Sequence, residues 1–150
     1  MKTLVIHPRD QLLYPSWAWD GNAIVFMRRR SPAIAGIWIA AVADGTVAAE
    51  PSWVEISPPQ TENSRPRFSP DGGSVYYAMG RAGQRLLVSQ KIDKRTHALI
   101  DEPVQLVRMP VEFTALTGAG GPYPLISVTP KRLFYSVVTE RSNLWVSRVN

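Results

Sequence analysis

The feature of this sequence that most constrains its fold is an internal repeat. Three segments align without a gap from a shared proline, at residues 15–26, 66–77 and 124–135. Each segment contains a short strand-like stretch, then turn residues, then an apolar strand-like stretch. This pattern predicts two strands joined by a hairpin turn. Asp-Gly occupies the turn in the first two copies, and it favours a tight turn because both residues tolerate left-handed backbone. Thr129-Pro130 replaces Asp-Gly in the third copy, so we expect a different turn there.

Two further apolar stretches follow the hairpin in the repeating unit. The third stretch is present in every copy, at residues 37–42, 86–92 and 144–149. The fourth stretch ends in proline and follows in the first two copies, at residues 53–58 and 104–110. The unit therefore has four predicted strands. No segment shows the 3.6-residue periodicity of a helix, so we expect no helix.

Four-stranded units that repeat every ~40 to 50 residues are typical of β-propeller blades. One small sheet cannot bury both of its faces alone, whereas blades stacked around an axis cover one another. We therefore predict an all-β fold with a single propeller module over residues 1–150. Its three four-stranded repeats cover approximately residues 9–58, 59–110 and 111–150. A β-sandwich built by duplication is the alternative, but sandwiches rarely keep three repeats in register.

The predicted strands also suggest how the ring closes. Residues 3–8 have the apolar-then-proline form of the two fourth strands, and the third repeat has no fourth strand of its own. We expect strand 3–8 to complete the last blade of the same or a partner chain, because this closure removes an exposed sheet edge. Three blades are fewer than the ~4 to 8 of ordinary propellers. We therefore predict a half-ring that dimerises into a six-bladed propeller, with a fragment of a longer propeller as the alternative.

One copy of the repeat carries a recognisable motif. Residues 67–77, Arg-Phe-Ser-Pro-Asp-Gly-Gly-Ser-Val-Tyr-Tyr, closely resemble the core motif of TolB-like, WD-repeat-like β-propellers. Residues 15–26 resemble a degenerate copy in which Trp19 stands at the motif's proline, and residues 143–146 are similar to the family's strand signature. The resemblance covers roughly residues 15–150. It implies a bacterial or archaeal propeller, often periplasmic or joined to sensor, regulator or peptidase domains, and a binding scaffold more often than a catalyst.

Composition and charge narrow the function classes. The net charge is +5, and the densest basic cluster is Arg28-Arg29-Arg30. The other basic residues are interspersed with acids, and no nucleic-acid-binding motif accompanies them, so we favour a solvated basic rim over nucleic acid. No apolar run reaches the ~18 residues of a membrane span. The absence of cysteine excludes a disulfide scaffold and a thiol nucleophile, and it leaves the compartment, periplasmic or cytoplasmic, open.

The sequence offers no catalytic constellation. His7 and His97 have no metal-ligand spacing, and Gly-x-Ser-x-Gly is absent. Asp20 and Asp71 recur at equivalent positions, but their place in the turns explains them better than a calcium site does. We therefore predict no catalytic residue, no cofactor and no metal. A lyase or glycosidase propeller ranks last, because its channel needs convergent acids and histidines.

These observations predict a non-catalytic propeller scaffold that binds a protein, peptide or ligand and forms a homodimer. The alternative is the propeller domain of a larger enzyme or sensor, such as a peptidase or a kinase-associated regulator. We expect the binding surface at the ring mouth, on loops 28–36, 81–85 and 117–124. An exposed Trp19 is suited to gripping a peptide or sugar, and the basic residues favour an acidic partner. The candidate binding residues are Trp19, Arg28, Arg29, Arg30, Arg81, Arg85 and Tyr123.

Overall fold

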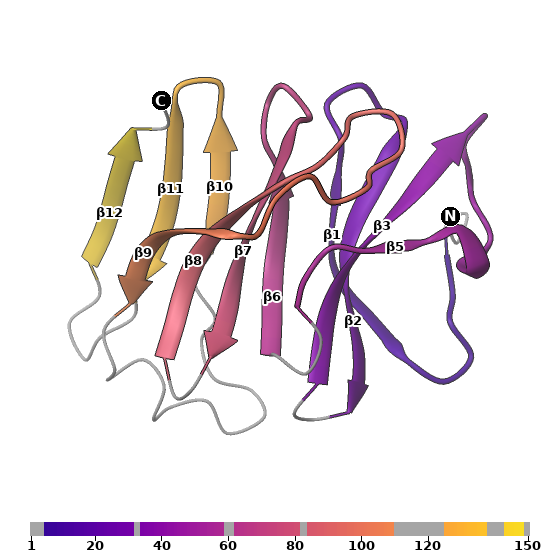
Figure 1. Ribbon diagram of the computed structural model, residues 1–150, viewed down its shortest axis with the longest axis horizontal. Helices are drawn as coiled ribbons and strands as arrows, with labels where there is room; N and C mark the ends of the chain where they lie inside the picture. Colours follow the sequence, from indigo (N-terminus) through magenta and orange to yellow (C-terminus); the bar gives the residue numbers. More distant parts are fainter. Residues whose placement is uncertain are drawn as a thin grey trace.

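The computed structural model describes residues 5–31, 34–58, 62–81, 84–109, 125–137 and 143–148. Almost all of the regular structure in these residues is β-strand, which confirms the predicted fold class. The strands form a row of small sheets whose order in space follows the order of the sequence (Figure 1). Within the described residues, no helix has the length and apolar character that crossing a membrane requires.

The first group of strands, which we call unit 1, is antiparallel. Its strands are β1 (Gln11–Trp17), β2 (Ala23–Ser31), β3 (Ile34–Ala43) and β5 (Val54–Glu55), with β4 (Thr46–Val47) pairing with the end of β3. The fourth strand is shorter than expected, because only two residues of segment 53–58 pair with β3. A one-turn 3-10 helix, η1 (Glu50–Ser52), precedes it where no helix is expected. Pro51 favours this turn, since its fixed φ suits the first helical positions.

The remaining strands form two more antiparallel groups. Unit 2 contains β6 (Glu62–Phe68), β7 (Ser74–Arg81), β8 (Gln84–Lys91) and β9 (Val104–Met109). Unit 3 contains β10 (Ile126–Thr129), β11 (Arg132–Val137) and β12 (Asn143–Arg148). A single parallel pair, Ala35 with Glu62, joins units 1 and 2 into one mixed sheet. Among the described residues no fourth strand pairs with unit 3, so its completion by segment 3–8 stays a prediction.

The hairpin turns confirm the role that the repeat predicts for Asp-Gly. Gly21 and Gly72 have φ angles of 76° and 73°, in the left-handed region that glycine adopts without steric cost. Asp20 accepts a hydrogen bond from the backbone N–H two residues later at 3.0 Å, and Asp71 does the same at 3.2 Å. Each carboxylate therefore closes its own turn, as short polar side chains commonly do.

The third copy closes its hairpin by a different interaction, as expected from its sequence. The backbone N–H of Arg132 donates to the hydroxyl oxygen of Thr129 at 3.1 Å, and that hydroxyl donates to the carbonyl oxygen of Arg132 at 3.2 Å. A threonine hydroxyl thus substitutes for the aspartate carboxylate in joining β10 to β11.

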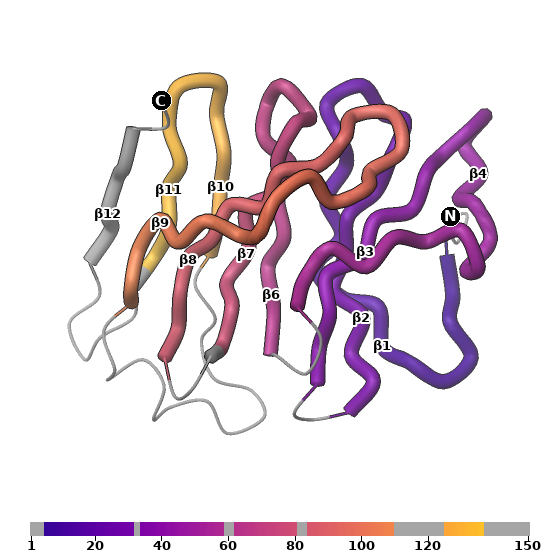
Figure 2. The backbone as a smooth tube through the Cα atoms, in the orientation of Figure 1, coloured from indigo at the N-terminus to yellow at the C-terminus, as the bar shows by residue number. Residues whose placement is uncertain are grey.

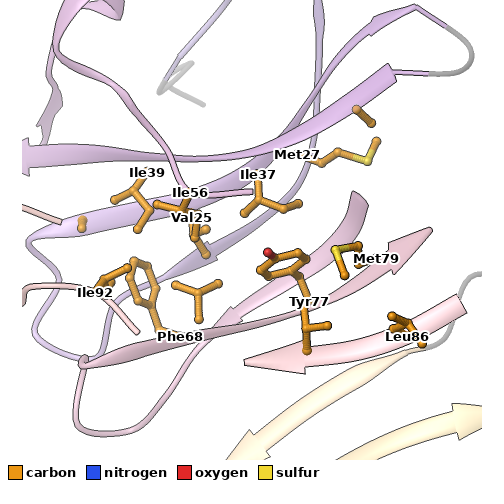
Figure 3. Close-up of a cluster of buried hydrophobic side chains, with 14 residues drawn as sticks. Val25, Met27, Ile37, Ile39, Ile56, Phe68, Tyr77, Met79, Leu86 and Ile92 are labelled. Atoms are coloured by element: carbon orange, nitrogen blue, oxygen red, sulfur yellow. The ribbon is translucent and has the colours of Figure 1, made fainter. Parts of the chain in front are cut away.

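The hydrophobic core lies between neighbouring units rather than inside one sheet. Successive side chains on a strand point to opposite faces, so Tyr77 faces unit 1 whereas Tyr76 faces unit 3. Figure 3 shows the first interface, where side chains of unit 1 meet those of unit 2. They include Val25, Met27, Ile37 and Ile39 from unit 1 and Phe68, Tyr77, Met79 and Ile92 from unit 2. Unit 2 therefore buries both of its faces, as a stacked sheet must.

The outer face of unit 1 has a third apolar cluster. Its buried members include Ile24, Phe26 and Trp53, and the N-terminal residue Val5 packs against them. Figure 2 shows the N-terminal segment beside β4 and the loop that follows it. Segment 5–10 therefore lies on the face of unit 1 that points away from unit 2.

Candidate functional site

The structure separates the predicted binding residues into two groups. The β1–β2, β6–β7 and β10–β11 turns lie at one end of the sheets, uppermost in Figure 1, and Trp19 belongs to the first of them. Residues 28–30, the end of β7 at Arg81 and the start of β8 at Arg85 lie at the opposite end. The side chain of Arg81 and all of Tyr123 fall outside the described residues. Trp19 and the arginines therefore do not form one surface.

Trp19 stands at a small pocket between units 1 and 2. Its side chain is 62% exposed, and it lines a cavity of about 120 Å³ with Phe68, Asp71 and His97 among the other lining residues. Burial lowers the pKa of His97, although nearby carboxylates act to raise it. Ligand pockets generally measure roughly 300 to 1,000 Å³. This cavity suits a single side chain of a partner rather than a whole small molecule.

Arg28 is buried, at 8% exposure, where the sequence predicts a surface residue. Its Nε donates to a carboxylate oxygen of Asp10 at 2.5 Å, and its Nη2 lies 2.7 Å from Glu50. The guanidinium lies 5.0 Å from the ring centre of Trp38 and 5.9 Å from that of Trp53. The reason is strand alternation, because Arg28 shares a face with Phe26, and segment 5–10 covers that face.

His7 completes this group of polar side chains. Its ring is only 6% exposed, and its Nε2 lies 3.0 Å from a carboxylate oxygen of Glu50. The same Nε2 lies 3.0 Å from Nη2 of Arg28. Its Nδ1 accepts a hydrogen bond from the backbone N–H of Asp10 at 2.8 Å. We call His7, Asp10, Arg28 and Glu50 the N-terminal clamp, because they hold the segment before β1 onto unit 1.

Electrostatics keep the carboxylates of the N-terminal clamp ionised. Burial by itself acts to raise the pKa of Asp10 and of Glu50. The hydrogen bonds and positive charge of Arg28 outweigh burial and hold both pKa values below their usual range. Burial also acts to lower the pKa of Arg28, but the same two carboxylates raise it. At neutral pH the clamp therefore contains two carboxylates around one guanidinium.

Arg85 and Arg30 are also engaged inside the chain. Arg85 is 2% exposed, and its Nη2 donates to a carboxylate oxygen of Glu62 at 2.8 Å. Arg30 lies 3.6 Å from Glu55, with its guanidinium 5.0 Å from the centre of the Trp38 ring. The prediction of a basic binding surface at the ring mouth is therefore wrong for Arg28 and Arg85, because both are buried and bind carboxylates of their own chain. The binding role of the remaining candidates stays a prediction.

The first strands of units 1 and 2 share an irregularity that was not expected from the sequence. In β1 the register shifts between Leu13 and Ser16, and in β6 it shifts between Ser64 and Arg67. The residue before each aligned proline, Tyr14 or Arg65, lies in these bulges with positive φ, 54° and 56° respectively. Positive φ is uncommon for such residues, and bulges and strained backbone concentrate at functional sites. The sequence signal for these bulges was the shared proline, because the bulged residue comes directly before it in both copies.

The two bulges meet across the boundary between units 1 and 2. The guanidinium of Arg65 lies 3.9 Å from the centre of the Tyr14 ring. Arg67 is half-buried in the same strand and donates to the carbonyl oxygen of Pro66 at 2.8 Å. Burial and the charge of Arg65 both lower the pKa of Arg67. We call Tyr14, Arg65 and Arg67 the inner-strand arginine site.

Metal binding finds no support in the described part of the chain. Within those residues, no three histidine, aspartate or glutamate side chains are grouped closely enough to hold a metal ion. The two histidines lie in different places, His7 in the N-terminal clamp and His97 in the pocket beside Trp19.

Solved structures share this fold at low sequence identity. TolB from Acinetobacter baumannii superposes with a TM-score of 0.62 at 19% identity, over 94% of this chain and 30% of that protein. A candidate TolB from Agrobacterium tumefaciens gives 0.58 at 14%, over 87% and 39%. A puromycin-hydrolysing peptidase from Mycobacterium tuberculosis gives 0.62 at 15%, over 97% and 22%. No protein-family model and no curated protein matches the sequence.

These similarities confirm the predicted resemblance at the level of the fold. The described strands have the arrangement found in TolB propellers and in a peptidase that shares it. The chain spans only 22% to 39% of the length of these proteins. It therefore corresponds to a part of such a molecule.

Proposed function

We propose that this chain is a non-catalytic β-propeller scaffold that binds a protein or ligand after its outer faces are covered by further blades. In the simplest assembly a second copy supplies those blades and closes a six-bladed ring. The TolB-type fold supports the proposal, because stacked sheets of this kind bury their faces only against neighbouring sheets.

The observation that carries this proposal is the outer face of unit 1. Below the segment that holds Val5, this face contains an apolar cavity of about 200 Å³ lined by Val5, Leu12, Pro15, Ile24 and Phe26. The opposite face of the same unit is closed by unit 2, and both faces of unit 2 are buried. Among the described residues no further unit packs on this face, so its apolar cavity is a place where a further sheet would pack.

The N-terminal segment has the alternation that a strand between two packed sheets needs. Val5 packs against the outer cluster of unit 1, whereas Ile6 is 76% exposed and points away from it. The N-terminal clamp holds this segment in place through His7. An exposed apolar side chain beside a sheet face supports a role for segment 3–8 in ring closure.

Absolute mass in solution tests the assembly. Light scattering behind a sizing column is expected to give a compact dimer near twice 16.7 kDa. A monomer at all accessible concentrations contradicts closure by a second copy.

Strand exchange is tested by a double substitution in the N-terminal segment. Leu4→Asp with Ile6→Asp introduces two charges where we expect a covered strand, so the dimer should dissociate. The matched control is Leu99→Asp with Ile100→Asp, because these side chains are 50% and 58% exposed in the β8–β9 loop. A compact dimer that survives the first double substitution contradicts strand exchange.

The second candidate function is the propeller part of a larger enzyme. One similar structure is a peptidase, and this chain covers 22% of it. In that case the remaining sequence supplies both further blades and a catalytic domain. The gene that encodes this chain decides between the two, because the alternative requires a separate hydrolase domain in the same reading frame.

A further inference from the structure

We propose that the inner-strand arginine site, Tyr14, Arg65 and Arg67, binds a carboxylate group of an acidic peptide. This inference rests on the proposed scaffold function and specifies which residues contact the partner and what chemistry they recognise. None of the three residues belongs to the ring-mouth surface that the sequence predicts.

The site lies on the first strands of units 1 and 2, which contact each other. Strand β6 contacts β1 of unit 1 on one side and β10 of unit 3 on the other. The contact of Arg65 with the Tyr14 ring joins β6 to β1 at 3.9 Å. Two guanidiniums are therefore concentrated on β6, beside the first strand of unit 1.

The charge of this site is not balanced by any carboxylate in the part of the chain that the structure describes. Arg28, Arg30 and Arg85 all have a carboxylate partner. Among the described residues no carboxylate pairs with Arg65 or Arg67, and the Nε of Arg65 is buried without a hydrogen-bond acceptor. A guanidinium that loses water without gaining an acceptor costs free energy, unless a ligand supplies the acceptor. Arg67 donates to the carbonyl oxygen of Pro66 but has no carboxylate partner among the described residues, so the Nε of Arg65 and the positive charge of both guanidiniums are available to an anion.

The geometry favours a carboxylate over other anions. A guanidinium is a planar fork of N–H donors that matches the two oxygens of a carboxylate, and an aromatic ring on its face keeps that fork oriented. The ring of Tyr14 has this position against Arg65. Nucleic acid needs a longer track of cations along its backbone, whereas this site has two. A peptide chain with Asp or Glu side chains fits two arginines that are two positions apart on one strand.

The backbone keeps the site in place. Tyr14 and Arg65 have φ angles of 54° and 56° because each occupies a bulge, and each is followed by a proline whose φ is fixed. The third copy of the repeat has Tyr123 before Pro124 at the corresponding sequence position, outside the described residues. Two rigid bulges hold the aromatic ring and the guanidinium together without a ligand, so binding costs little ordering of the site.

Calorimetric titration of the full chain tests the proposal. The probe is a synthetic peptide, acetyl-Gly-Asp-Glu-Asp-Gly-amide, and the reference is acetyl-Gly-Asn-Gln-Asn-Gly-amide, which differs only in its carboxylates. We expect saturable binding of the acidic peptide alone. Arg65→Gln and Arg67→Gln should each weaken binding about tenfold or more, because each removes charge-assisted hydrogen bonds. Arg65→Lys should recover only part of the affinity, since lysine keeps the charge but lacks the planar fork.

The matched control is Arg108→Gln, which removes the same charge from an exposed position on the outer strand β9. Its affinity should equal that of the unchanged protein. Equal loss in all three glutamine variants, or equal binding of the amide peptide, overturns the proposal. Inorganic phosphate and a single-stranded oligonucleotide serve as competitors. The proposal is also overturned if either competitor displaces the peptide at a lower concentration than free acidic peptide does.

The mass of the same samples separates this inference from the proposed assembly. A dimer that fails to bind the peptide contradicts the carboxylate site and leaves the scaffold assembly standing. A monomer that binds the peptide supports the site and contradicts the assembly. Circular dichroism of each variant verifies that the strands are retained, so that a loss of affinity is not a loss of folding.

Discussion

The N-terminal clamp illustrates how single residues determine the local stability of this protein. Asp10 and Glu50 both have pKa values below the ordinary values of 3.8 and 4.5. Near those values the unfolded chain therefore binds more protons than the folded chain does. Stability from these groups is complete above the unfolded pKa values and is lost as pH falls through the lower, folded ones.

Asp10→Asn provides a test at the residue scale. The unchanged protein should lose thermal stability as pH falls below the ordinary pKa values of 4.5 and 3.8, because the unfolded chain then binds protons that the clamp carboxylates bind only at lower pH. The variant should be less stable at neutral pH by about 1 to 3 kcal/mol, since Arg28 loses a charged partner. It should also show a smaller loss on acidification. Thermal unfolding followed by circular dichroism at several pH values measures both effects.

Asp44→Asn is the matched control for this prediction. Asp44 is exposed in the β3–β4 turn with a φ of 51°, a conformation that asparagine also adopts. Its pH profile should follow that of the unchanged protein. If Asp10→Asn and the unchanged protein show the same dependence on pH, the clamp does not contribute to acid sensitivity.

At the scale of elements, the three hairpin turns are closed by two different kinds of side-chain hydrogen bond. An aspartate carboxylate closes the β1–β2 and β6–β7 turns, whereas the Thr129 hydroxyl closes the β10–β11 turn. Both side chains accept a hydrogen bond from a backbone N–H that the turn would otherwise leave without a partner. The repeat therefore conserves the geometry of the hairpin and not the residue that closes it.

Thr129→Val tests this interpretation, because valine keeps the branched shape but cannot accept a hydrogen bond. We expect a loss of about 1 kcal/mol in the free energy of unfolding. Hydrogen exchange at the amide of Arg132 should become faster, since that N–H loses its acceptor. Thr129→Ser retains the hydroxyl and should exchange like the unchanged protein. Equal exchange in both variants shows that the hydroxyl does not hold the turn.

At the scale of the whole molecule, the proposed assembly depends on the outer face of unit 1, on which no further unit of the described residues packs. Packing of unit 2 between units 1 and 3 buries both faces of unit 2 and one face of each of its neighbours. The outer cluster of unit 1 is covered in part by Val5 and Leu12 and retains an apolar cavity. A neighbouring sheet removes this apolar surface from water, which is the usual driving force for association.

Leu12→Lys places a charge at this face and should prevent the proposed dimer from forming, because a lysine covered by another sheet has no partner. Leu106→Lys is the control, since Leu106 is 43% exposed on the outer strand β9. Sedimentation velocity of both variants measures the change in mass. A dimer that persists in Leu12→Lys, or dissociates equally in Leu106→Lys, contradicts assembly through unit 1.

Local patterns in the sequence predicted most of the strands and turns. Segment 66–77 forms β7 and the turn before it as expected, because alternating apolar residues and Asp-Gly act within a few residues of one another. The predicted arginine surface failed at Arg28 and Arg85 for the opposite reason. Their partners lie on other segments, and nothing in the local sequence of Arg28 indicates that Asp10 and Glu50 enclose it.

The repeat, the strand content and the chemistry of the turns can be read from the sequence alone, since each depends on neighbouring residues and backbone preference. The covered strand faces, the bulges in β1 and β6 and the pairing of charges emerge only when the sheets pack together. His7 and Glu50 are 43 positions apart, and Tyr14 contacts Arg65 from a different unit. Such contacts follow from how sheets stack, and their energies depend on burial that no single segment possesses.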